Sequence, residues 1–266
     1  MTTTGTSLDE LGTRRLHLGE LVATGWRLYW KVLARFLVIG LLVYIPINIG
    51  LTLVPVGEWI DKYGLRGFRM YMRVIQLLDF LFGTIATLGL AKLVETTVRG
   101  ETLSCWSALW HALKRWPAAL GTGIIAGLIL LGLFLCLIVP GVIWSLYYSL
   151  ALYVVALRGL SGKAALDYSK ALVKGQWWRV LGLLLVFELM GLAAVLILGV
   201  PFYFTPDHPV LDVIDNTLGD LAAALGMVLA TVLMLNTDYL RQRQTPPALP
   251  ALSAPASAPL TADSSP

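Results

Sequence analysis

The chain has 266 residues, of which 57% are hydrophobic and 14% are charged, and its mean hydropathy is +0.75. A soluble domain of this length cannot bury so large an apolar surplus, so the composition excludes an ordinary soluble fold and predicts an all-α polytopic membrane protein. The formal net charge is +4, but the basic residues lie beside apolar runs. This placement favours contact with lipid headgroups over binding of nucleic acid.

The chain begins with a polar segment, residues 1–17, and continues with an amphipathic stretch, residues 18–31. Polar side chains in that stretch recur at helical spacing and share one face: Glu20, Thr24, Arg27 and Lys31. Residues 36–56 follow without a charge and would form about 31 Å of helix, which matches the apolar thickness of a bilayer. We expect Pro46 to kink this first span and Pro55 to mark its outer end.

Residues 74–94 predict a second span, and the connection before it, residues 57–73, is polar and aromatic. This connection contains three arginines at helical spacing: Arg66, Arg69 and Arg73. Residues 102–116 form a second amphipathic pattern, and either Thr102 or Ser104 can cap its N-terminus.

The third span is predicted over residues 117–139, where Gly123 and Gly127 form a GxxxG pattern that favours close helix packing. The dipeptide Pro140–Gly141 predicts a tight turn. The fourth span, residues 142–157, is short and rich in tyrosine and serine.

A third amphipathic helix is predicted over residues 161–175, followed by an aromatic and basic junction at Trp177–Arg179. Its polar side chains share one helical face: Lys163, Asp167, Lys170 and Lys174. The fifth and sixth spans are expected over residues 180–200 and 218–235. Residues 18–243 therefore form a single membrane domain, and the Pro-, Ala- and Ser-rich residues 244–266 predict a disordered tail.

The distribution of basic residues predicts the orientation. If both termini are cytoplasmic, sixteen of the 20 Lys and Arg residues lie on the inner side, and the other four lie within residues 57–73. Seven of the nine Trp residues also fall at the inner interface. We therefore expect a multi-pass protein of the bacterial inner membrane with cytoplasmic N- and C-termini. The three amphipathic helices would lie flat at the cytoplasmic headgroups.

The order of elements also indicates an internal repeat. Residues 104–109 and 161–166 share the pattern S-x-x-[SA]-A-L, and each is followed by an aromatic and basic cluster, an apolar run and a proline. The chain is therefore interpreted as three parallel units, each an interfacial helix followed by a transmembrane hairpin.

Residues around the third amphipathic helix carry a family resemblance: Pro140–Gly141, Ala165–Leu166, Ser169, Val173–Gly175 and Trp177–Arg179. In these positions, and in residues 16–36, the chain resembles the glycerophosphodiester phosphodiesterase membrane-domain family and related stand-alone bacterial inner-membrane proteins of unknown function. In fused members of that family a separate soluble barrel carries the catalysis. The chain has no room for such a barrel.

The His-Arg-Gly signature of those enzymes is also absent, because His17, His111 and His208 are followed by Leu, Ala and Pro. The resemblance therefore implies a membrane domain without the phosphodiesterase. No nucleophile–base pair, phosphate-binding loop, cofactor motif or metal motif appears in the sequence, so we expect a protein that is not an enzyme and has no cofactor.

Glu188 lies near the middle of the fifth span, where an ionised carboxylate costs on the order of 3 kcal/mol or more. One interpretation is a substrate, ion or proton site. The other is a protonated side chain that bonds to a neighbouring helix, which we favour because no basic residue lies at the same depth. The candidate polar site combines Glu188 with residues of the fourth span: Ser145, Tyr148 and Ser149.

Two further groups of charged residues are candidates for contacts. The inner amphipathic segments supply candidate lipid-headgroup contacts: Arg27, Lys31, Lys114, Arg115, Lys163, Lys170, Lys174 and Arg179. Simple anchoring of the topology is the alternative role for these residues. The outer connections supply candidate ion pairs: Arg66, Arg69 and Arg73 with Asp207, Asp212 and Asp215. A metal site in the acidic loop is the less favoured alternative.

These observations predict a non-enzymatic integral membrane protein that acts as a lipid- or partner-interacting scaffold. The expected partners are membrane lipids, including anionic ones, and a protein partner or a second copy of the chain, with no nucleic acid. The alternative function is a small transporter or channel component that uses Glu188 and the Tyr/Ser face of the fourth span.

Overall fold

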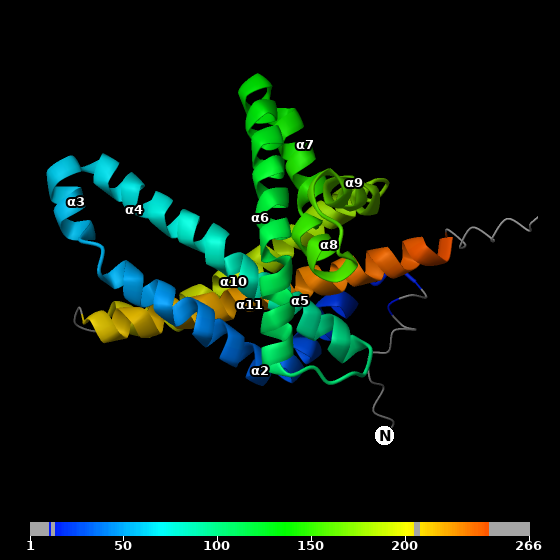
Figure 1. Cartoon of the computed structure of the whole chain (residues 1–266), viewed down its shortest axis with the longest axis horizontal. Coiled ribbons are helices and arrows are strands. Elements are labelled where there is room, and N and C mark those ends of the chain that lie inside the picture. Colours follow the sequence, from blue (N-terminus) through cyan, green and yellow to red (C-terminus); the bar gives the residue numbers. More distant parts are fainter. Residues whose placement is uncertain (1–10, 12–13, 205–207, 245–266) are drawn as a thin grey trace, which may run out of the picture.

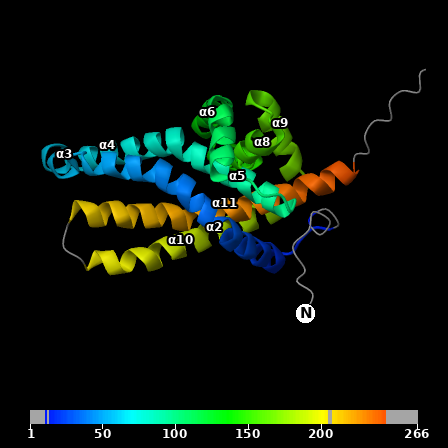
Figure 2. The ribbon, with the colours of Figure 1, turned by 60° about the horizontal axis from the view of Figure 1, so that its bottom comes forward.

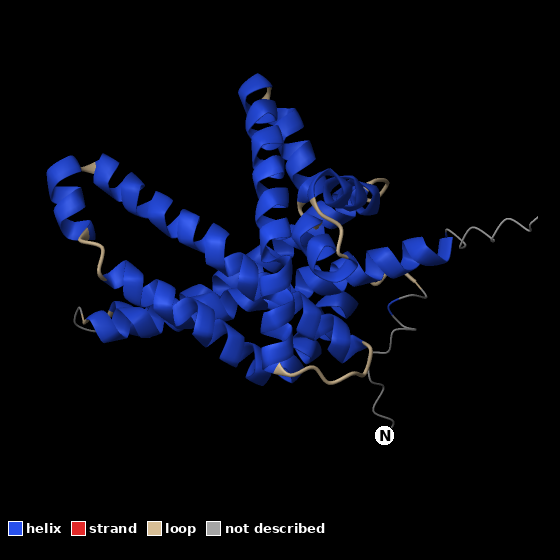
Figure 3. Cartoon of the chain, in the orientation of Figure 1, coloured by secondary structure: helices blue, strands red, loops and turns tan. Residues whose placement is uncertain are grey.

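The computed structural model describes residues 11, 14–204 and 208–244, and its regular structure within these ranges is entirely helical (Figure 3). The predicted all-α class is confirmed. The elements, in chain order, are α2 (Leu18–Thr52), α3 (Val56–Tyr63), α4 (Leu65–Leu78), the π-helical turn η1 (Asp79–Gly83), α5 (Thr84–Val98), α6 (Cys105–Cys136), α7 (Ile138–Tyr148), α8 (Ala151–Arg158), α9 (Gly162–Val173), α10 (Trp177–Tyr203) and α11 (Pro209–Gln244).

Six helical stretches in the described ranges are long and apolar enough to cross a membrane, which confirms the six predicted spans. They are Leu18–Thr52, Leu65–Val98, Cys105–Cys136, Ile138–Arg158, Trp177–Pro201 and Val210–Arg243. The sixth is longer than expected, because the acidic residues before it continue the helix. Apart from Gln244, the predicted tail lies outside the described residues.

The spans form three hairpins that meet at one end; the first and third continue side by side through α2 and α11, whereas the second diverges from both (Figures 1 and 2). These hairpins are α2 with α4–α5, α6 with α7–α8, and α10 with α11. We call the shared region, where α2, α6 and α10 begin and α5, α8 and α11 end, the convergent end. In Figure 1 the tips of the first and third hairpins lie on the left, whereas the α6–α7 tip points upward.

The core lies around α5 and α11, where successive side chains are fully buried on several faces of each helix. Close packing of α2 against α11 depends on two glycines. A Cβ at Gly25 would lie 2.3 Å from Leu229 Cδ2, and one at Gly40 would lie 2.8 Å from Leu221 Cδ2. Because lipid tails are as apolar as these side chains, small residues that permit a close approach are a main source of helix association in membranes.

Two of the three predicted interfacial helices are not separate elements, so the expectation of three flat helices is wrong. Residues 18–31 and 105–116 are the first turns of α2 and α6, which continue directly into their spans. In α2 the helix continues because no Gly or Pro lies between residues 31 and 36. In α6 the helix continues even through Pro117. The predicted cap is correct, since Ser104 Oγ accepts a hydrogen bond from Ser107 N at 3.2 Å.

The third amphipathic stretch does form a helix of its own, α9. It ends where Gly175 adopts a φ of +84°, a left-handed conformation that favours glycine. The buried face of α9 contains the apolar residues expected from the pattern: Ala165, Leu166, Leu172 and Val173.

The turn predicted at Pro140–Gly141 occurs earlier, at the extended residue Leu137. Pro140 lies in the first turn of α7. Proline is tolerated there because an N–H group in the first turn would have no helical carbonyl to bond to. Gly141 packs against the ring of Phe134, and a Cβ there would lie 2.5 Å from Cδ1. The fourth span is also divided, because α7 ends at Tyr148 and α8 begins at Ala151.

The predicted first outer connection is helical and forms α3 and α4. The five-residue turn η1 then joins α4 to α5 without ending the helix. The wide π-helical turn has its own polar partners: Thr84 Oγ1 donates to Phe80 O at 2.7 Å, and Trp116 Nε1 donates to Leu81 O.

Candidate functional site

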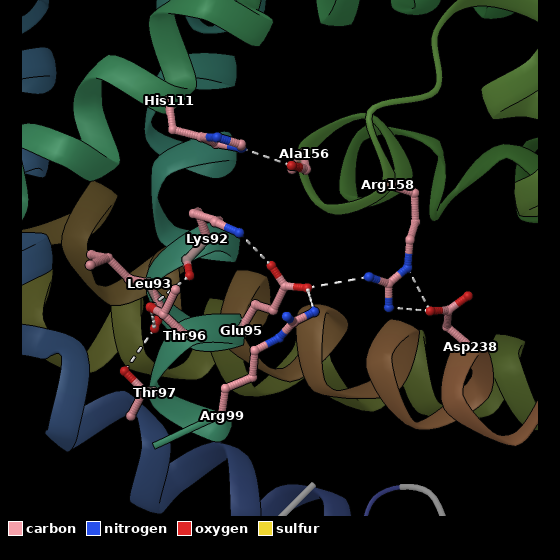
Figure 4. Close-up of polar contacts among 10 residues, drawn as sticks. All are labelled: Lys92, Leu93, Glu95, Thr96, Thr97, Arg99, His111, Ala156, Arg158 and Asp238. Carbon is pink, nitrogen blue, oxygen red and sulfur yellow. Dashed lines mark hydrogen bonds and ion pairs between the residues drawn. The ribbon is translucent and has the colours of Figure 1, made fainter. Parts of the chain in front are cut away.

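A buried carboxylate, Glu95 of α5, organises the polar contacts at the convergent end (Figure 4). Only 1% of its side chain is exposed. Its Oε2 accepts from Lys92 Nζ at 2.8 Å, and its Oε1 accepts from Arg99 Nη2 at 2.8 Å. Arg158 of α8 adds a longer contact, with Nη1 at 3.3 Å from Oε1.

The second buried carboxylate is Asp238 of α11, whose side chain is fully buried. Arg158 donates to its Oδ2 through Nε at 2.7 Å and also through Nη2. The Tyr168 hydroxyl of α9 donates to Oδ1, and Gln242 Nε2 donates to Oδ2 at 2.9 Å. Burial raises the pKa of the Tyr168 hydroxyl, and its hydrogen bond to Asp238 raises that pKa further.

Arg158 therefore bridges both carboxylates and joins α5, α8 and α11, one helix from each hairpin (Figure 4). We call Lys92, Glu95, Arg99, Arg158 and Asp238 the charge network. A buried charge loses several kcal/mol of hydration, on the order of the attraction that a well-placed partner returns. Lys92 and Arg99 reach Glu95 from the same helix, whereas Asp238 receives its cation only from Arg158 of another hairpin, so the whole network is satisfied only when the three hairpins are together.

The end of α8 is held by α6 through two further contacts. His111 Nε2 lies 2.8 Å from Ala156 O, and Arg115 Nη1 donates to Gly159 O at 3.0 Å. Gly159 has a φ of +71°, which ends the helix, and a Cβ at this position would lie 2.6 Å from the Arg115 guanidinium. Both bonds thus occupy carbonyls that a helix C-terminus leaves free.

A third polar contact fixes the start of the described chain. Asn236 of α11 is fully buried, and its Nδ2 donates to Leu11 O at 2.7 Å and to Arg14 O at 3.0 Å. Its Oδ1 accepts from Arg179 Nη2 of α10 at 3.2 Å. The same Arg179 nitrogen also donates to Leu16 O at 2.9 Å. Residues 14–17 are therefore packed between α10 and α11.

Two cavities open beside these residues. The smaller, which we call the basic cavity, has a volume of about 130 Å³. It is lined by Arg15, Ala171, Leu172, Lys174, Gln176, Thr237, Leu240 and Arg241. The larger, which we call the α10 groove, has a volume of about 560 Å³. It is lined by Arg15, Leu16, His17, Leu18, Trp178, Arg179, Gly182, Leu183 and Val186.

A separate polar cluster lies inside the spans, nearer the tips of the first and third hairpins. Asn48 of α2 has 3% of its surface exposed, and its Nδ2 donates to Thr217 Oγ1 at 3.0 Å and to Asp220 Oδ2 at 2.9 Å. Asp220 and Asp215 also line a cavity of about 530 Å³ between α10 and α11.

The structure does not bring the residues of the predicted intramembrane site into contact with one another. Glu188 is exposed on α10, and no hydrogen bond joins it to another described residue. Ser145 and Ser149 bond to carbonyls of their own helix, Val142 O and Leu146 O, both at 2.8 Å. Tyr148 contacts Trp144 with its ring. The serines bond within α7 because a Ser side chain reaches the preceding helical turn.

The candidate headgroup contacts fall into two groups. Five are exposed and make no ion pair within the described ranges: Arg27, Lys31, Lys114, Lys163 and Lys174. Among these five, Lys114 Nζ lies 5.5 Å from the centre of the Trp110 ring. The other three are partly buried and contact the protein more closely. Arg115 and Arg179 bond to carbonyls, and Lys170 Nζ lies 4.1 Å from the centre of the Trp144 ring.

The predicted outer ion pairs do not form among the described residues. Arg66, Arg69 and Arg73 are exposed, as is Asp212, and none of the ion pairs found in the described ranges includes them or Asp215. The reason is that α2 packs on α11, while α3 and α4 lie apart from the α10–α11 tip (Figure 1). Asp207 lies outside the described residues. Within these ranges no group of three or more His, Cys, Asp or Glu side chains is arranged to hold a metal ion.

Sequence reasoning did not identify Glu95 or Asp238 as site residues. Glu95 lies three residues after Lys92 and four before Arg99, and Asp238 lies three before Arg241. Lone carboxylates at this spacing from basic residues, where a span ends, are the pattern that would have identified both. Comparisons with protein families, with curated proteins and with solved structures find nothing that matches this chain.

Proposed function

We propose that this integral membrane protein is a non-enzymatic, lipid-interacting scaffold whose convergent end faces the cytoplasm of a bacterial cell. The observation that carries the proposal is the exposure of tryptophans at the start of three spans. Trp30 of α2 is 57% exposed, Trp106 of α6 is 70% exposed and Trp178 of α10 is 79% exposed. Tryptophan is enriched where a span meets the headgroups, because its ring is apolar and its N–H is polar.

Basic residues at the same end support contact with anionic headgroups. Lys31, Lys114 and Lys163 are exposed and carry no ion pair among the described residues. Each basic residue near an anionic membrane surface contributes about 1 kcal/mol of attraction. The charge network supports the scaffold part of the proposal, because it uses its cations internally and holds the hairpins in a fixed relation.

Fluorescence quenching tests this proposal. The protein is reconstituted into nanodiscs that contain brominated phosphatidylglycerol or, at the same mole fraction, brominated phosphatidylcholine, and tryptophan emission is measured. We expect stronger quenching by the anionic lipid because it is enriched beside the exposed tryptophans. The triple variant Lys31→Gln, Lys114→Gln, Lys163→Gln should reduce the difference between the two lipids.

The matched control is Lys62→Gln, which removes a cation at the opposite end of the first hairpin, on α3. It should leave the difference unchanged. Equal quenching of the native protein by the two lipids would count against the proposal.

A second candidate function, a small transporter, rests on the cluster of Asn48, Thr217 and Asp220 in place of Glu188. Polar groups inside spans are rare and often mark ion pathways. A proton-coupled function requires a titratable Asp220. Asp220→Asn should therefore abolish proton flux into proteoliposomes if this candidate is correct, and the absence of flux in the native protein would reject it.

A further inference from the structure

The basic cavity contains cations without a carboxylate. Three of its lining side chains are basic, Arg15, Lys174 and Arg241, and no Asp or Glu lines it. This differs from the adjacent charge network, in which Glu95 and Asp238 contact the buried cations. Three cations around about 130 Å³ repel one another unless an anion lies among them.

Arg241 provides independent evidence for a missing acceptor. Its Nη1 is buried and has no hydrogen-bond partner among the described residues. The carboxylate nearest in sequence, Asp238, already accepts from Arg158, Tyr168 and Gln242. The Arg241 guanidinium is held 5.3 Å from the centre of the Tyr168 ring, which fixes it at the cavity wall. A buried charged donor left without an acceptor is unfavourable, so an acceptor supplied from outside would stabilise it.

Arg15 connects the basic cavity to the α10 groove, because it lines both. It is exposed and makes no hydrogen bond or ion pair with a described residue. Beyond Arg15, the groove changes from polar to apolar along α10, through Trp178, Gly182 and Leu183. A ligand that fills both spaces has an anionic head and an apolar chain that follows the span into the membrane.

We propose that the basic cavity and the α10 groove together form a specific binding site for one anionic glycerophospholipid. Its phosphate lies among Arg15, Lys174 and Arg241, and an acyl chain lies along Gly182 and Leu183. Gly182 leaves room for the chain, since nothing lies within 4 Å of the position that its Cβ would take. The inference rests on the proposed function but is narrower, because it places one tightly held lipid at four named elements: residues 14–17, α9, α10 and α11.

Native mass spectrometry of the full chain tests the site. The protein is purified in detergent, titrated with dioleoyl phosphatidylglycerol or dioleoyl phosphatidylcholine, and the retained lipid is counted. We expect one phosphatidylglycerol per chain at concentrations that leave phosphatidylcholine unbound. The double variant Arg15→Gln, Lys174→Gln should weaken this binding about thirtyfold, because each basic residue contributes to headgroup attraction.

Both substituted side chains are exposed and have no structural bond, so the fold should persist. The control variant Lys114→Gln, Lys163→Gln removes the same charge from the same end of the molecule but from neither cavity, and it should keep the bound lipid. Arg241→Lys retains the charge but removes the paired N–H donors of the guanidinium, so we expect an intermediate loss of lipid binding.

Equal retention of the two lipids by the native protein would overturn the proposal, as would unchanged retention by the Arg15→Gln, Lys174→Gln variant. Displacement of the lipid by 10 mM inorganic phosphate, used as a competing probe, would show that the cavity takes free phosphate and would overturn the lipid assignment. Loss of this single site with undiminished quenching in nanodiscs would reject the specific site and leave the general lipid contact in place.

Discussion

Arg158 is the side chain that bonds to both buried carboxylates of the charge network. It contacts Glu95 through Nη1 and Asp238 through Nε and Nη2. Glu95 has two other cations, Lys92 and Arg99, whereas Asp238 has no other charged partner among the ion pairs of the described ranges. Asp238 therefore depends on Arg158 more than Glu95 does.

Replacing Arg158 with Gln should lower the free energy of unfolding by about 3–5 kcal/mol, because it leaves Asp238 as a buried charge without a cation. Thermal unfolding in detergent, followed by circular dichroism, measures the loss. Arg66→Gln, at an exposed position on α4, is the control and should change stability by about 0.5 kcal/mol or less. A loss below about 1 kcal/mol for Arg158→Gln would contradict the importance of the bridge.

Tyr168 predicts a dependence of stability on alkaline pH. Its pKa is higher in the folded chain than its ordinary value near 10, because the hydroxyl is partly buried and bonds to Asp238. The unfolded chain therefore releases this proton first, and the contribution to stability is complete below pH 10 and falls as pH rises through the folded pKa. Unfolding midpoints measured from pH 9 to 11 should decline less steeply for Tyr168→Phe than for the native protein; parallel curves would contradict this.

At the scale of elements, the close approach of α2 to α11 depends on glycine, and a substitution by alanine measures how much of that approach stability requires. Gly25→Ala places a Cβ that would lie 2.3 Å from Leu229 Cδ2, so the helices must separate or Leu229 must change rotamer. We expect a loss of about 1–3 kcal/mol in a denaturant titration. Gly19→Ala on the same helix meets nothing within 4 Å and should be neutral or slightly stabilising. Equal effects at the two positions would contradict close packing at Gly25.

The long apolar runs made the six spans predictable, because a run of about 20 apolar residues has the length and composition of a transmembrane helix. The ends of the elements were not predictable in the same way. Residues 18–31 have the pattern of a surface helix, but such a helix ends only where a residue such as Gly or Pro breaks it, and neither lies between residues 31 and 36. Pro140 is compatible both with a turn and with the first turn of a helix, and packing of Gly141 on Phe134 accompanies the second arrangement.

The charge network was beyond sequence reasoning for a different reason. Glu95 and Arg158 lie 63 residues apart, so their pairing depends on how the hairpins meet. The basic residues near both positions are equally consistent with a topology signal, and nothing in the local sequence separates the two roles. The exposed lysines, in contrast, needed no tertiary information, and Lys31, Lys114 and Lys163 are exposed as the amphipathic pattern predicted.

At the scale of the whole molecule, all three hairpins meet only at the convergent end, and the two cysteines of α6 mark the two ends of the second hairpin. Cys105 is partly buried at the start of α6, whereas Cys136 is exposed at the tip of the same helix. The predicted orientation places Cys136 outside. A membrane-impermeant maleimide should therefore label intact spheroplasts through Cys136, and Cys136→Ser should abolish the labelling. Labelling that appears only after permeabilisation would reverse the orientation.

Asp238 lies in α11, the last span of the described chain to be synthesised, and this order has a consequence for assembly. Until α11 enters the membrane, Lys92, Arg99 and Arg158 share the single carboxylate Glu95, which leaves two charges in excess. A nascent chain with this excess has no stable way to bury its first two hairpins together. We therefore expect the first two hairpins to pack stably against each other only after α11 has been inserted, and a chain cut short before residue 238 to be degraded faster than the full chain.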